Sequence, residues 1–367
     1  MKIISVEPIL LELPYRHNGP VVPFGGVALP SVRCLLVRVE TEDGLVGWGE
    51  AFGYGVIPAT IVALRTLVAP LAVGRDARDI KGLVEQIAQT VHMFGRSGPA
   101  QYAISGLDIA LWDLAGKRAG CSVATLLGGH HRERIKAYSS FSINKTRDHL
   151  HVSVEIALAR GFKAIKLHEV TVEAVAATRE KLPDIIDLMV DTNCPWRPDE
   201  AVDMARRMQP FGLTWLEEPI WPPEDLAGLE RLRDACDVPL AVGENLGNPW
   251  MFKPFVQSSA IAYLQPSVIK IGGVTQFMKV MAMAEMEGRT VAPHSPYFGP
   301  GLLATLQIAA HSPIIPIIEI VEFEMEFPVF GTVGLPEADG MITIPDAPGL
   351  GADPSPELLE RFSVSIQ

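Results

Sequence analysis

Short apolar runs recur along residues 128–325, and most of them stop at a polar side chain. Successive runs stop 21 to 29 residues apart, which is about the length of a strand followed by a helical crossover. The segments between them carry a helical period. Eight such runs end near Phe141, His168, Asp191, Glu217, Glu244, Gln265, His294 and Ile320. The pattern therefore predicts a (β/α)7-8 TIM-type barrel, an α/β fold that usually takes about 250 residues.

Two further segments flank the predicted barrel. Residues 1–127 open with alternating strands, of which 33–40 and 45–50 are joined by a Gly-containing turn, and then change to a helical period, most clearly over 100–118. Residues 326–367 return to a turn-rich β pattern, with a late strand at 340–345. We therefore predict an N-terminal α+β capping domain over 1–127, a barrel over 128–325, and a C-terminal segment over 326–367 that packs back on the capping domain.

Composition argues against several classes of partner. With 48% apolar and 20% charged residues, the chain has ample core material. The net charge of −12 argues against nucleic acid or an anionic membrane, because both attract clustered Lys and Arg. No apolar run approaches the roughly 20 residues of a membrane span, and residues 1–7 look like a strand rather than a signal peptide. The four cysteines lack CxxC spacing, so we expect free thiols and a cytoplasmic location.

Three acidic residues close three consecutive apolar runs: Asp191, Glu217 and Glu244. The carboxyl ends of parallel barrel strands meet at one face, so we expect these carboxylates to converge there. Carboxylate oxygens favour a hard cation, Mg²⁺ first and Mn²⁺ second. Lys166 and His168 close the preceding run and are two residues apart, so on a strand they point to the same side. A metal beside a Lys/His pair indicates an enzyme that removes a proton from carbon.

Six motifs in order along the chain carry a resemblance to a known family. They lie at 42–50, 103–113, 215–219, 243–245, 270–275 and 344–351, and the third reads Trp-Leu-Glu-Glu-Pro. Together they resemble the mandelate racemase/muconate lactonizing enzyme group of the enolase superfamily. The resemblance implies Mg²⁺ held by Asp191, Glu217 and Glu244, with the carboxylate of the substrate bound to that ion. It further implies His168 as the base that takes the α-proton, and Lys166 as its assistant.

The resemblance also assigns roles on the opposite face of the site. His294 stands where family racemases and many dehydratases carry a histidine that an aspartate of the sixth strand orients. Ser267 occupies that aspartate position, so the dyad is broken, although its hydroxyl can still hydrogen-bond His294. The loss counts most against a racemase, which needs two symmetric bases. Family cycloisomerases carry lysine at this position, which argues against cycloisomerisation.

Four more residues are candidates for binding the substrate. Glu319 matches the family's carboxylic acid that hydrogen-bonds the substrate carboxylate. Asn193, two residues after Asp191, would point the same way if the strand continues. Arg16 and His17 open a loop rich in Gly and Pro, over 16–30, that has the length of a functional lid.

These observations lead to one hypothesis and two alternatives. We expect an Mg²⁺-dependent lyase, an acid-sugar dehydratase, in which His168 is the base and His294 protonates the departing hydroxyl. The alternatives are a racemase or epimerase of a 2-hydroxy acid or related carboxylate, and a catalytically silent metal-binding homologue. The expected partner is a small-molecule carboxylate, and the resemblance implies a homo-oligomer, either a dimer or an octamer.

Overall fold

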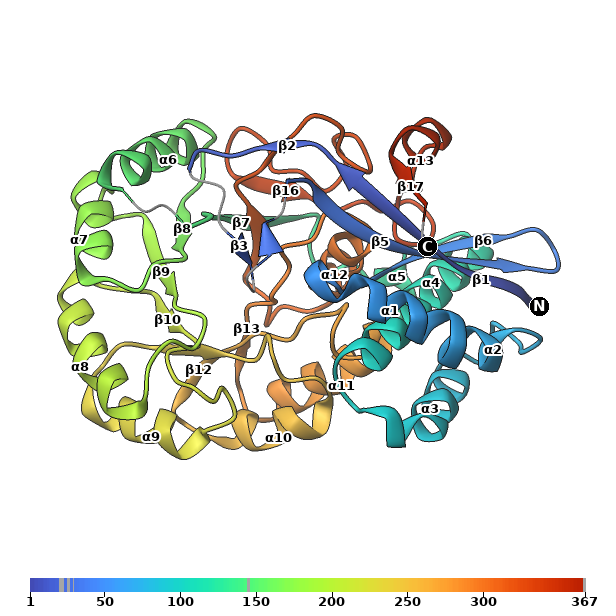
Figure 1. The fold of residues 1–367 in the computed structure, drawn as a ribbon, viewed down its shortest axis with the longest axis horizontal. Coiled ribbons are helices and arrows are strands. Elements are labelled where there is room, and N and C mark those ends of the chain that lie inside the picture. Colours follow the sequence, from blue (N-terminus) through green and yellow to red (C-terminus); the bar gives the residue numbers. More distant parts are fainter. Residues whose placement is uncertain (20–22, 25–26, 29, 144–145, 366–367) are drawn as a thin grey trace.

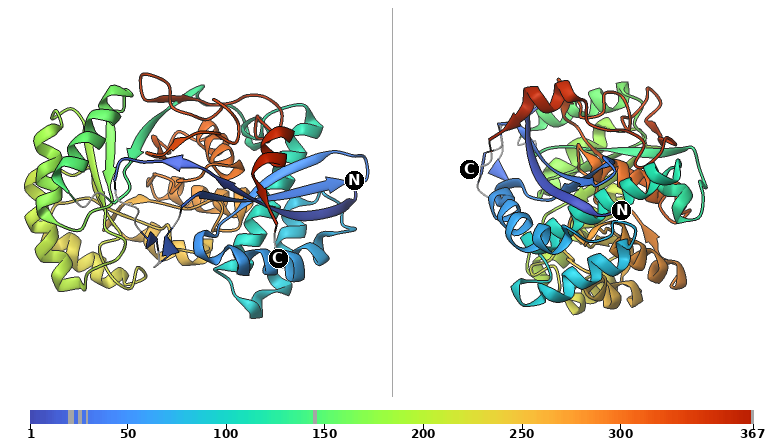
Figure 2. Two further views of the ribbon diagram at one scale, coloured as in Figure 1. Left: turned by 45° about the horizontal axis from the view of Figure 1, so that its top comes forward. Right: turned by 90° about the vertical axis from the view of Figure 1, so that its right-hand side faces the viewer.

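The computed structural model describes residues 1–19, 23–24, 27–28, 30–143 and 146–365 (Figure 1). Part of the loop at 16–30 that we expected to form a lid therefore lies outside the described residues. Two parts are visible, a ring of parallel strands surrounded by helices and a smaller α+β part beside it (Figure 2). We call the smaller part the cap. The α/β fold that the sequence pattern predicted is confirmed.

The cap is built on a four-stranded sheet in the order β17-β1-β5-β6. β1 (Ile3–Leu13) pairs antiparallel with β5 (Val32–Thr41), which pairs antiparallel with β6 (Val46–Ala51). The turn between β5 and β6 contains Gly44 at φ +82°, a left-handed conformation that glycine adopts without strain. The fourth strand, β17 (Ser363–Val364), comes from the far end of the chain and pairs with β1.

Helices cover one face of this sheet. The helices that precede the barrel are η1 (Tyr54–Val56), α1 (Ile57–Ala63), η2 (Leu64–Val68), α2 (Ala69–Ala72), α3 (Ile80–Thr90), η3 (His92–Phe94), α4 (Pro99–Ala119) and α5 (Val123–Leu127). The longest, α4, lies so close to β6 that a Cβ at Gly49 would stand 1.9 Å from the carbonyl oxygen of Gly106. Only glycine permits this approach of helix to strand.

One helical stretch of the cap differs from the sequence expectation about membrane spans. Residues Tyr54–Ala72 are 19 residues long and apolar enough to cross a membrane by length and composition. However, Ile57, Ile61, Leu64 and Val68 are buried in the core of the cap itself, and the stretch changes between 3-10, α and π geometry. We therefore interpret it as a core helix of the cap.

Three buried carboxylates join the cap to its neighbours. Glu50 at the end of β6 accepts a hydrogen bond from the backbone N–H of Gly301, 2.8 Å away at the start of a barrel helix. Asp108 on α4 accepts one from the N–H of Thr275 at 3.0 Å, again in the first turn of a barrel helix. Both carboxylates thus satisfy N–H groups that a helix leaves unpaired at its N-terminus. The Asp113 carboxylate accepts hydrogen bonds from the backbone N–H groups of Trp48 and Leu350, and so connects β6 to the C-terminal segment.

The barrel has eight parallel strands in the order β13-β12-β11-β10-β9-β8-β7-β14. Neighbouring strands are consecutive in sequence except at β7 and β14, as expected for repeated β/α units. Ser295 joins the two ends of this order, because its Oγ lies 3.2 Å from both the carbonyl oxygen and the N–H nitrogen of Glu319. The strands are β7 (Arg134–Ser140), β8 (Ala164–Leu167), β9 (Asp187–Asp191), β10 (Trp215–Glu217), β11 (Leu240–Val242), β12 (Ile261–Leu264), β13 (Thr290–Val291) and β14 (Ile317–Val321).

Helices surround these strands, as Figure 1 shows for α6 to α10. Several begin at a residue whose side chain caps the first free N–H groups, such as Thr146, Thr171 and Asp225. The barrel helices are α6 (Arg147–Ala159), α7 (Val172–Lys181), α8 (Pro198–Met208), η4 (Gln209–Phe211), α9 (Leu226–Ala235), α10 (Pro249–Gln257), α11 (Gly273–Met286) and α12 (Pro300–His311).

Side chains inside the barrel form layers. One apolar cluster contains Tyr138, Ala164, Met189, Trp215, Ala241, Tyr263, Ala292 and Ile317, one residue from each strand or its end. Side chains two positions further along a strand point to the same side. The next layer toward the carboxyl ends, which we call the mouth layer, is therefore Ser140, Lys166, Asp191, Glu217, Gly243, Gln265, His294 and Glu319. Most of the chemistry that the sequence predicted lies in this layer.

The C-terminal segment touches both parts of the molecule. After β15 (Glu324–Met325), which pairs with β2 (Tyr15–Arg16), the late strand β16 (Met341–Thr343) pairs antiparallel with β7 of the barrel. α13 (Pro356–Phe362) and β17 then return to the cap, with Leu358 buried against β1. A short hairpin, β3 (Pro23–Phe24) and β4 (Val27–Ala28), completes the strands of the described residues. The domain boundaries at 127 and 325 stay a prediction.

Candidate active site

The three acidic residues of the sequence pattern meet at the mouth of the barrel, Asp191 and Glu217 within the mouth layer and Glu244 one residue beyond it. One carboxylate oxygen from each of Asp191, Glu217 and Glu244 lies within 4.8 Å of the other two. Asp191 and Glu217 are direct neighbours in the register of β9 and β10. Glu244 follows Gly243, whose φ of +134° turns the chain as β11 ends. We call these three residues the carboxylate triad.

Lys166 is fully buried among acidic side chains. Its Nζ lies 2.9 Å from a Glu217 oxygen, 2.9 Å from a Glu319 oxygen and 3.4 Å from Asp191 Oδ2. Burial opposes the charge of this ammonium, but the neighbouring carboxylates outweigh burial and raise the pKa of Lys166 well above its usual value. Lys166 is therefore a fixed positive charge at the base of the site rather than a proton acceptor.

His168 presents a defined ring nitrogen to the same carboxylates. Its Nδ1 lies 2.5 Å from the backbone carbonyl oxygen of Phe141, an atom that can only accept a hydrogen bond. Nδ1 must therefore carry a proton, which leaves Nε2 to face the site, 3.2 Å from Asp191 Oδ2. Burial lowers the pKa of His168, but the Asp191 carboxylate outweighs burial and the net direction is upward.

The carboxylate triad suits a divalent cation. Burial and the Asp191 charge raise the pKa of Glu217 well above its usual value, because several negative charges share one small volume. Burial also opposes ionisation of Asp191, yet Lys166 and His168 hold its pKa below the ordinary value. The three carboxylates thus share one small volume with the Lys166 ammonium, and a divalent ion with oxygen ligands fits the donor set.

His294 approaches the triad from another side. Its Nε2 lies 2.8 Å from Glu244 Oε2, whereas His168 contacts Asp191. Strands β8 and β13, after which the two histidines lie, are separated by β7 and β14 on one side of the ring. The histidines therefore flank the triad from different strands. Glu319 lies between them on β14, where it pairs with Lys166 and accepts a hydrogen bond from the N–H of Ser295 at 3.3 Å.

Ser267 does not reach His294 directly among the described contacts. Instead its hydroxyl forms a short hydrogen bond with the hydroxyl of Tyr297. Tyr297 Oη lies 3.3 Å from His294 Nδ1 and 2.6 Å from the backbone carbonyl oxygen of His294. The structure therefore places a tyrosine between the two residues whose positions match the family's His–Asp dyad. Tyr297 was not among the residues that the sequence analysis singled out.

A polar chain that the sequence did not reveal lies behind Glu244. Asn245 donates from Nδ2 to Glu218 Oε2 at 2.7 Å and to a Glu244 oxygen at 3.1 Å, and it accepts from Lys270 Nζ at 3.0 Å. The Lys270 ammonium also lies 4.8 Å from the centre of the Phe52 ring, which the cap supplies. Because the Asn245 amide holds one of the two carboxylate oxygens of Glu244, this polar chain fixes the orientation of one triad ligand.

The cap also places aromatic rings beside the mouth. Phe52 contacts Tyr54 and Tyr102 with ring centres 5.0 Å apart in each case. Burial raises the pKa of Tyr54, and the charges of Glu244 and Glu319 raise it further. The cap therefore supplies apolar and phenolic groups to a mouth layer that is otherwise charged.

The remaining predicted residues lie around the rim of the mouth. Asn193 is exposed and left-handed at φ +51°, and its backbone N–H donates to Asp191 Oδ1 at 2.9 Å. Arg16 is exposed on β2, and His17 Nδ1 lies 3.0 Å from Ser142 Oγ just beyond β7. None of the described contacts of these three residues tests a role in substrate binding, so that role stays a prediction.

Two members of the mouth layer are buried without a polar partner among the described residues. Both amide atoms of Gln265 and the hydroxyl oxygen of Ser140 lack a hydrogen bond, and both residues are fully buried. An unsatisfied buried amide costs about 1–3 kcal/mol. These groups are thus free to bind a polar ligand or a water, and the strand-end pattern near Gln265 was the sequence signal that could have found it.

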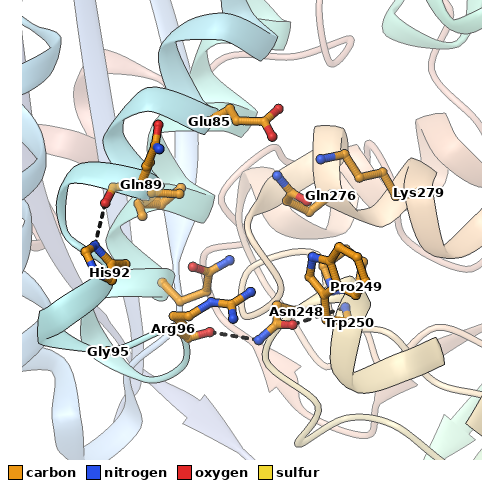
Figure 3. A pocket seen from close by; sticks show the side chains of 13 residues that line it. Glu85, Gln89, His92, Gly95, Arg96, Asn248, Pro249, Trp250, Gln276 and Lys279 are labelled. Carbon is orange, nitrogen blue, oxygen red and sulfur yellow. Dashed lines mark hydrogen bonds between the residues drawn. The ribbon is translucent and has the colours of Figure 1, made fainter. Parts of the chain in front are cut away.

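A separate cavity of about 470 Å³ lies at the junction of cap and barrel (Figure 3). Arg96, Trp250 and Lys279 are among the side chains that line it, and Asn248, also in the lining, donates to the carbonyl oxygen of Arg96 at 3.2 Å. No member of the carboxylate triad is among its described lining residues. This cavity is therefore distinct from the mouth of the barrel.

Comparison with known proteins gives two family matches and many similar chains. Residues 20–128 match the mandelate racemase/muconate lactonizing enzyme N-terminal domain, and residues 150–358 match the enolase C-terminal domain-like family. The chain is 32% identical to the D-galactarolactone cycloisomerase of Agrobacterium fabrum, over 99% of both proteins. It is 31% identical to the arabinonate dehydratase of Saccharolobus solfataricus, over 89% of both.

A solved structure agrees with these sequence matches. The 3,6-anhydro-D-galactonate cycloisomerase of Zobellia galactanivorans superposes with a TM-score of 0.87 at 26% identity, over 100% of both chains. The matches cover the cap, the barrel and the carboxylate triad, and members of this superfamily bind Mg²⁺. The chain therefore belongs to the mandelate racemase/muconate lactonizing enzyme group of the enolase superfamily.

Proposed function

We propose that this chain is an Mg²⁺-dependent acid-sugar dehydratase. The chain is an enzyme of the lyase or isomerase type, as its relatives are. The observation that carries the proposal is the placement of two histidines on different sides of one carboxylate triad, His168 beside Asp191 and His294 beside Glu244. One can act as base and the other as acid, which is what elimination of water requires.

Asp191, Glu217 and Glu244 would hold the cation. When bound, Mg²⁺ neutralises the charge that develops on the substrate carboxylate as the α-proton leaves. Lys166 adds a second fixed positive charge beneath the same position, because its Nζ is within 3.4 Å of three carboxylates. An α-proton beside a carboxylate is very weakly acidic, and these charges make its removal possible.

The protein's own groups then divide the reaction into two proton movements. His168 Nε2 takes the α-proton, while its Nδ1–H stays bound to the Phe141 carbonyl and fixes the ring. The bond from the β-carbon to its hydroxyl breaks, and His294 supplies the proton that lets this group leave as water. The resulting enol tautomerises to a 2-keto-3-deoxy acid. One proton is removed and one is delivered, so the reaction needs no external oxidant or reductant.

The environments of the two histidines favour a dehydratase over a racemase. A two-base racemase removes the α-proton on one face and delivers another proton on the opposite face, and the two bases exchange roles in the reverse direction, so they need comparable surroundings. Here His168 has a backbone carbonyl and an aspartate as partners, whereas His294 has a tyrosine and a glutamate. This asymmetry suits one dedicated base and one dedicated acid.

Cycloisomerisation is the second candidate, and the relatives favour it. Two of the similar proteins described above are named cycloisomerases. The argument against this activity from Ser267 is therefore weak. The same equipment would serve, because a ring oxygen on the β-carbon can leave in place of a hydroxyl after the same α-proton is removed. The two reactions then differ only in the leaving group that His294 protonates.

Proton NMR of the Mg²⁺-loaded enzyme in D₂O tests the proposal. The panel contains linear mono- and diacid sugars together with their lactones and anhydro forms. Loss of the α-proton with a 2-keto-3-deoxy product from a linear acid sugar supports the dehydratase. Turnover confined to cyclic substrates moves the assignment to cycloisomerase, and α-deuteration without elimination moves it to racemase or epimerase. No exchange with any substrate contradicts the proposal.

We also propose a cytoplasmic, oligomeric enzyme. All four cysteines are free thiols in the structure, as a reducing compartment requires. Oligomers of two or eight chains are the expectation from the family. Light scattering at several protein concentrations would measure the assembly, and a monomer at all of them would contradict this part.

A further inference from the structure

We propose that Tyr297, held by Ser267, is the positioning residue that fixes the ring orientation and tautomer of His294. This inference rests on the proposed function, in which His294 delivers a proton to the leaving group. In this arrangement the hydroxyl groups of Ser267 and Tyr297, both neutral, take the place of the carboxylate in the family's dyad. Three contacts carry it: Ser267 to Tyr297, Tyr297 to the His294 ring, and Tyr297 to the His294 backbone.

The direction of each hydrogen bond follows from counting protons. A phenol has one proton, and the carbonyl oxygen of His294, 2.6 Å from Tyr297 Oη, can only accept it. The remaining lone pairs of Oη must then accept, so the Ser267 hydroxyl donates to Oη. His294 Nδ1, 3.3 Å from Oη, faces a lone pair and carries a proton. Nε2 faces Glu244 Oε2, which can only accept, and the mouth of the barrel, so it is the nitrogen from which the proposed function delivers a proton.

Burial makes this arrangement rigid. Ser267 is 1% exposed, Tyr297 6% and His294 7%, so each polar atom depends on its protein partners. The two rings meet edge to face, with centres 5.8 Å apart and planes at 74°. Burial also raises the pKa of the Tyr297 hydroxyl well above its usual value, so the group stays protonated and neutral. A neutral partner orients the imidazole without adding negative charge beside the triad.

The kinetic test separates the delivery of a proton from its removal. In Tyr297→Phe the ring packing is kept and one hydroxyl is lost. We expect kcat for elimination to fall by about 10- to 100-fold, the usual effect of losing such a partner, with KM changed less than about twofold. Exchange of the α-proton with D₂O should be kept, because His168 does not contact Tyr297. The ratio of exchange to elimination should therefore rise.

A spectroscopic test does not need turnover and so separates this inference from the proposed function. Long-range ¹⁵N–¹H spectra of histidine-labelled, Mg²⁺-loaded enzyme report which ring nitrogen carries the proton, with His294→Asn used for assignment. We expect Nδ1 of His294 to carry a proton in the wild type, and this proton to be partly lost from Nδ1 in Tyr297→Phe. If no acid sugar is turned over but these spectra change as stated, the inference stands and the proposed function fails.

Two further variants complete the experiment. Tyr263→Phe removes a hydroxyl from a barrel tyrosine that packs against Trp215, and it should leave both readouts as in the wild type. The double variant Ser267→Asp/Tyr297→Phe supplies a carboxylate at the dyad position and should restore the Nδ1–H form. The inference is overturned if Tyr297→Phe leaves the tautomer unchanged, or if it lowers exchange and elimination equally while lowering the melting temperature.

Discussion

Glu50 offers a quantitative test of how the cap is fastened to the barrel. Its carboxylate is 5% exposed and accepts hydrogen bonds from Gly301 and Gly299 at the start of α12. Burial outweighs these bonds and raises the pKa of Glu50 from 4.5 to about 7. This difference in pKa corresponds to a free-energy difference of about 3 kcal/mol between the protonated and ionised forms in the folded protein. Because the folded-state pKa is raised, this contribution to stability is fully present below about pH 4.5 and is lost as pH rises through about 7.

The variant Glu50→Gln resembles the protonated carboxyl and cannot ionise. We therefore expect the two proteins to have similar free energies of unfolding near pH 4.5, and the wild type to lose about 3 kcal/mol relative to Glu50→Gln by about pH 8. Urea denaturation at several pH values measures this difference. Asp108 titrates in both proteins, so its contribution cancels. Glu7→Gln, on the exposed face of β1, is the matched control and should run parallel to the wild type. If the free energy of unfolding of Glu50→Gln also ran parallel to that of the wild type across this pH range, the reasoning would be refuted. The backbone N–H groups would then offset the effect of burial completely.

Two other predictions concern the mouth layer. Lys166→Met leaves Glu217, Glu319 and Asp191 without their shared cation, so in the presence of a chelator the free energy of unfolding should fall by about 3–5 kcal/mol, the usual cost of breaking a buried ion pair. Urea denaturation measures this loss, and added Mg²⁺ should restore part of it. A loss below about 1 kcal/mol would contradict the ion-pair geometry. Glu217→Gln removes one of three triad ligands and should weaken Mg²⁺ binding by at least about 100-fold, as measured by calorimetry. The control variant Glu324→Gln, at an exposed position, should bind Mg²⁺ as the wild type does. Equal Mg²⁺ affinities of Glu217→Gln and the wild type would exclude Glu217 as a ligand.

The sequence predicted the barrel and the triad because both depend on periodic features. The spacing of apolar runs sets the strand ends, and the two-residue period of a strand decides which side chains enter the mouth. Lys166 and His168 were found in this way, and both contact Asp191. The same rule applied to the sixth strand would have indicated Gln265 in the mouth layer.

Tyr297 and Lys270 could not be predicted in the same way. Both lie in loops beyond strand ends, where no period determines the direction of a side chain. Tyr297 reaches Ser267 and His294 only because the chain folds back three residues after His294. Phe52 and Tyr54 come from the cap, and their approach to the mouth depends on how cap and barrel dock. Tertiary contacts of this kind are not encoded in local patterns.

The central claim is that His168 removes the α-proton and that His294 acts later, on the leaving group. The most direct measurement follows α-proton exchange and product formation together by NMR in D₂O, for Mg²⁺-loaded wild type, His168→Asn and His294→Asn on the substrate that the panel identifies. The account predicts that His168→Asn loses both exchange and elimination, and that His294→Asn keeps exchange but loses elimination. Exchange that survives in His168→Asn, or that disappears in His294→Asn, would contradict it.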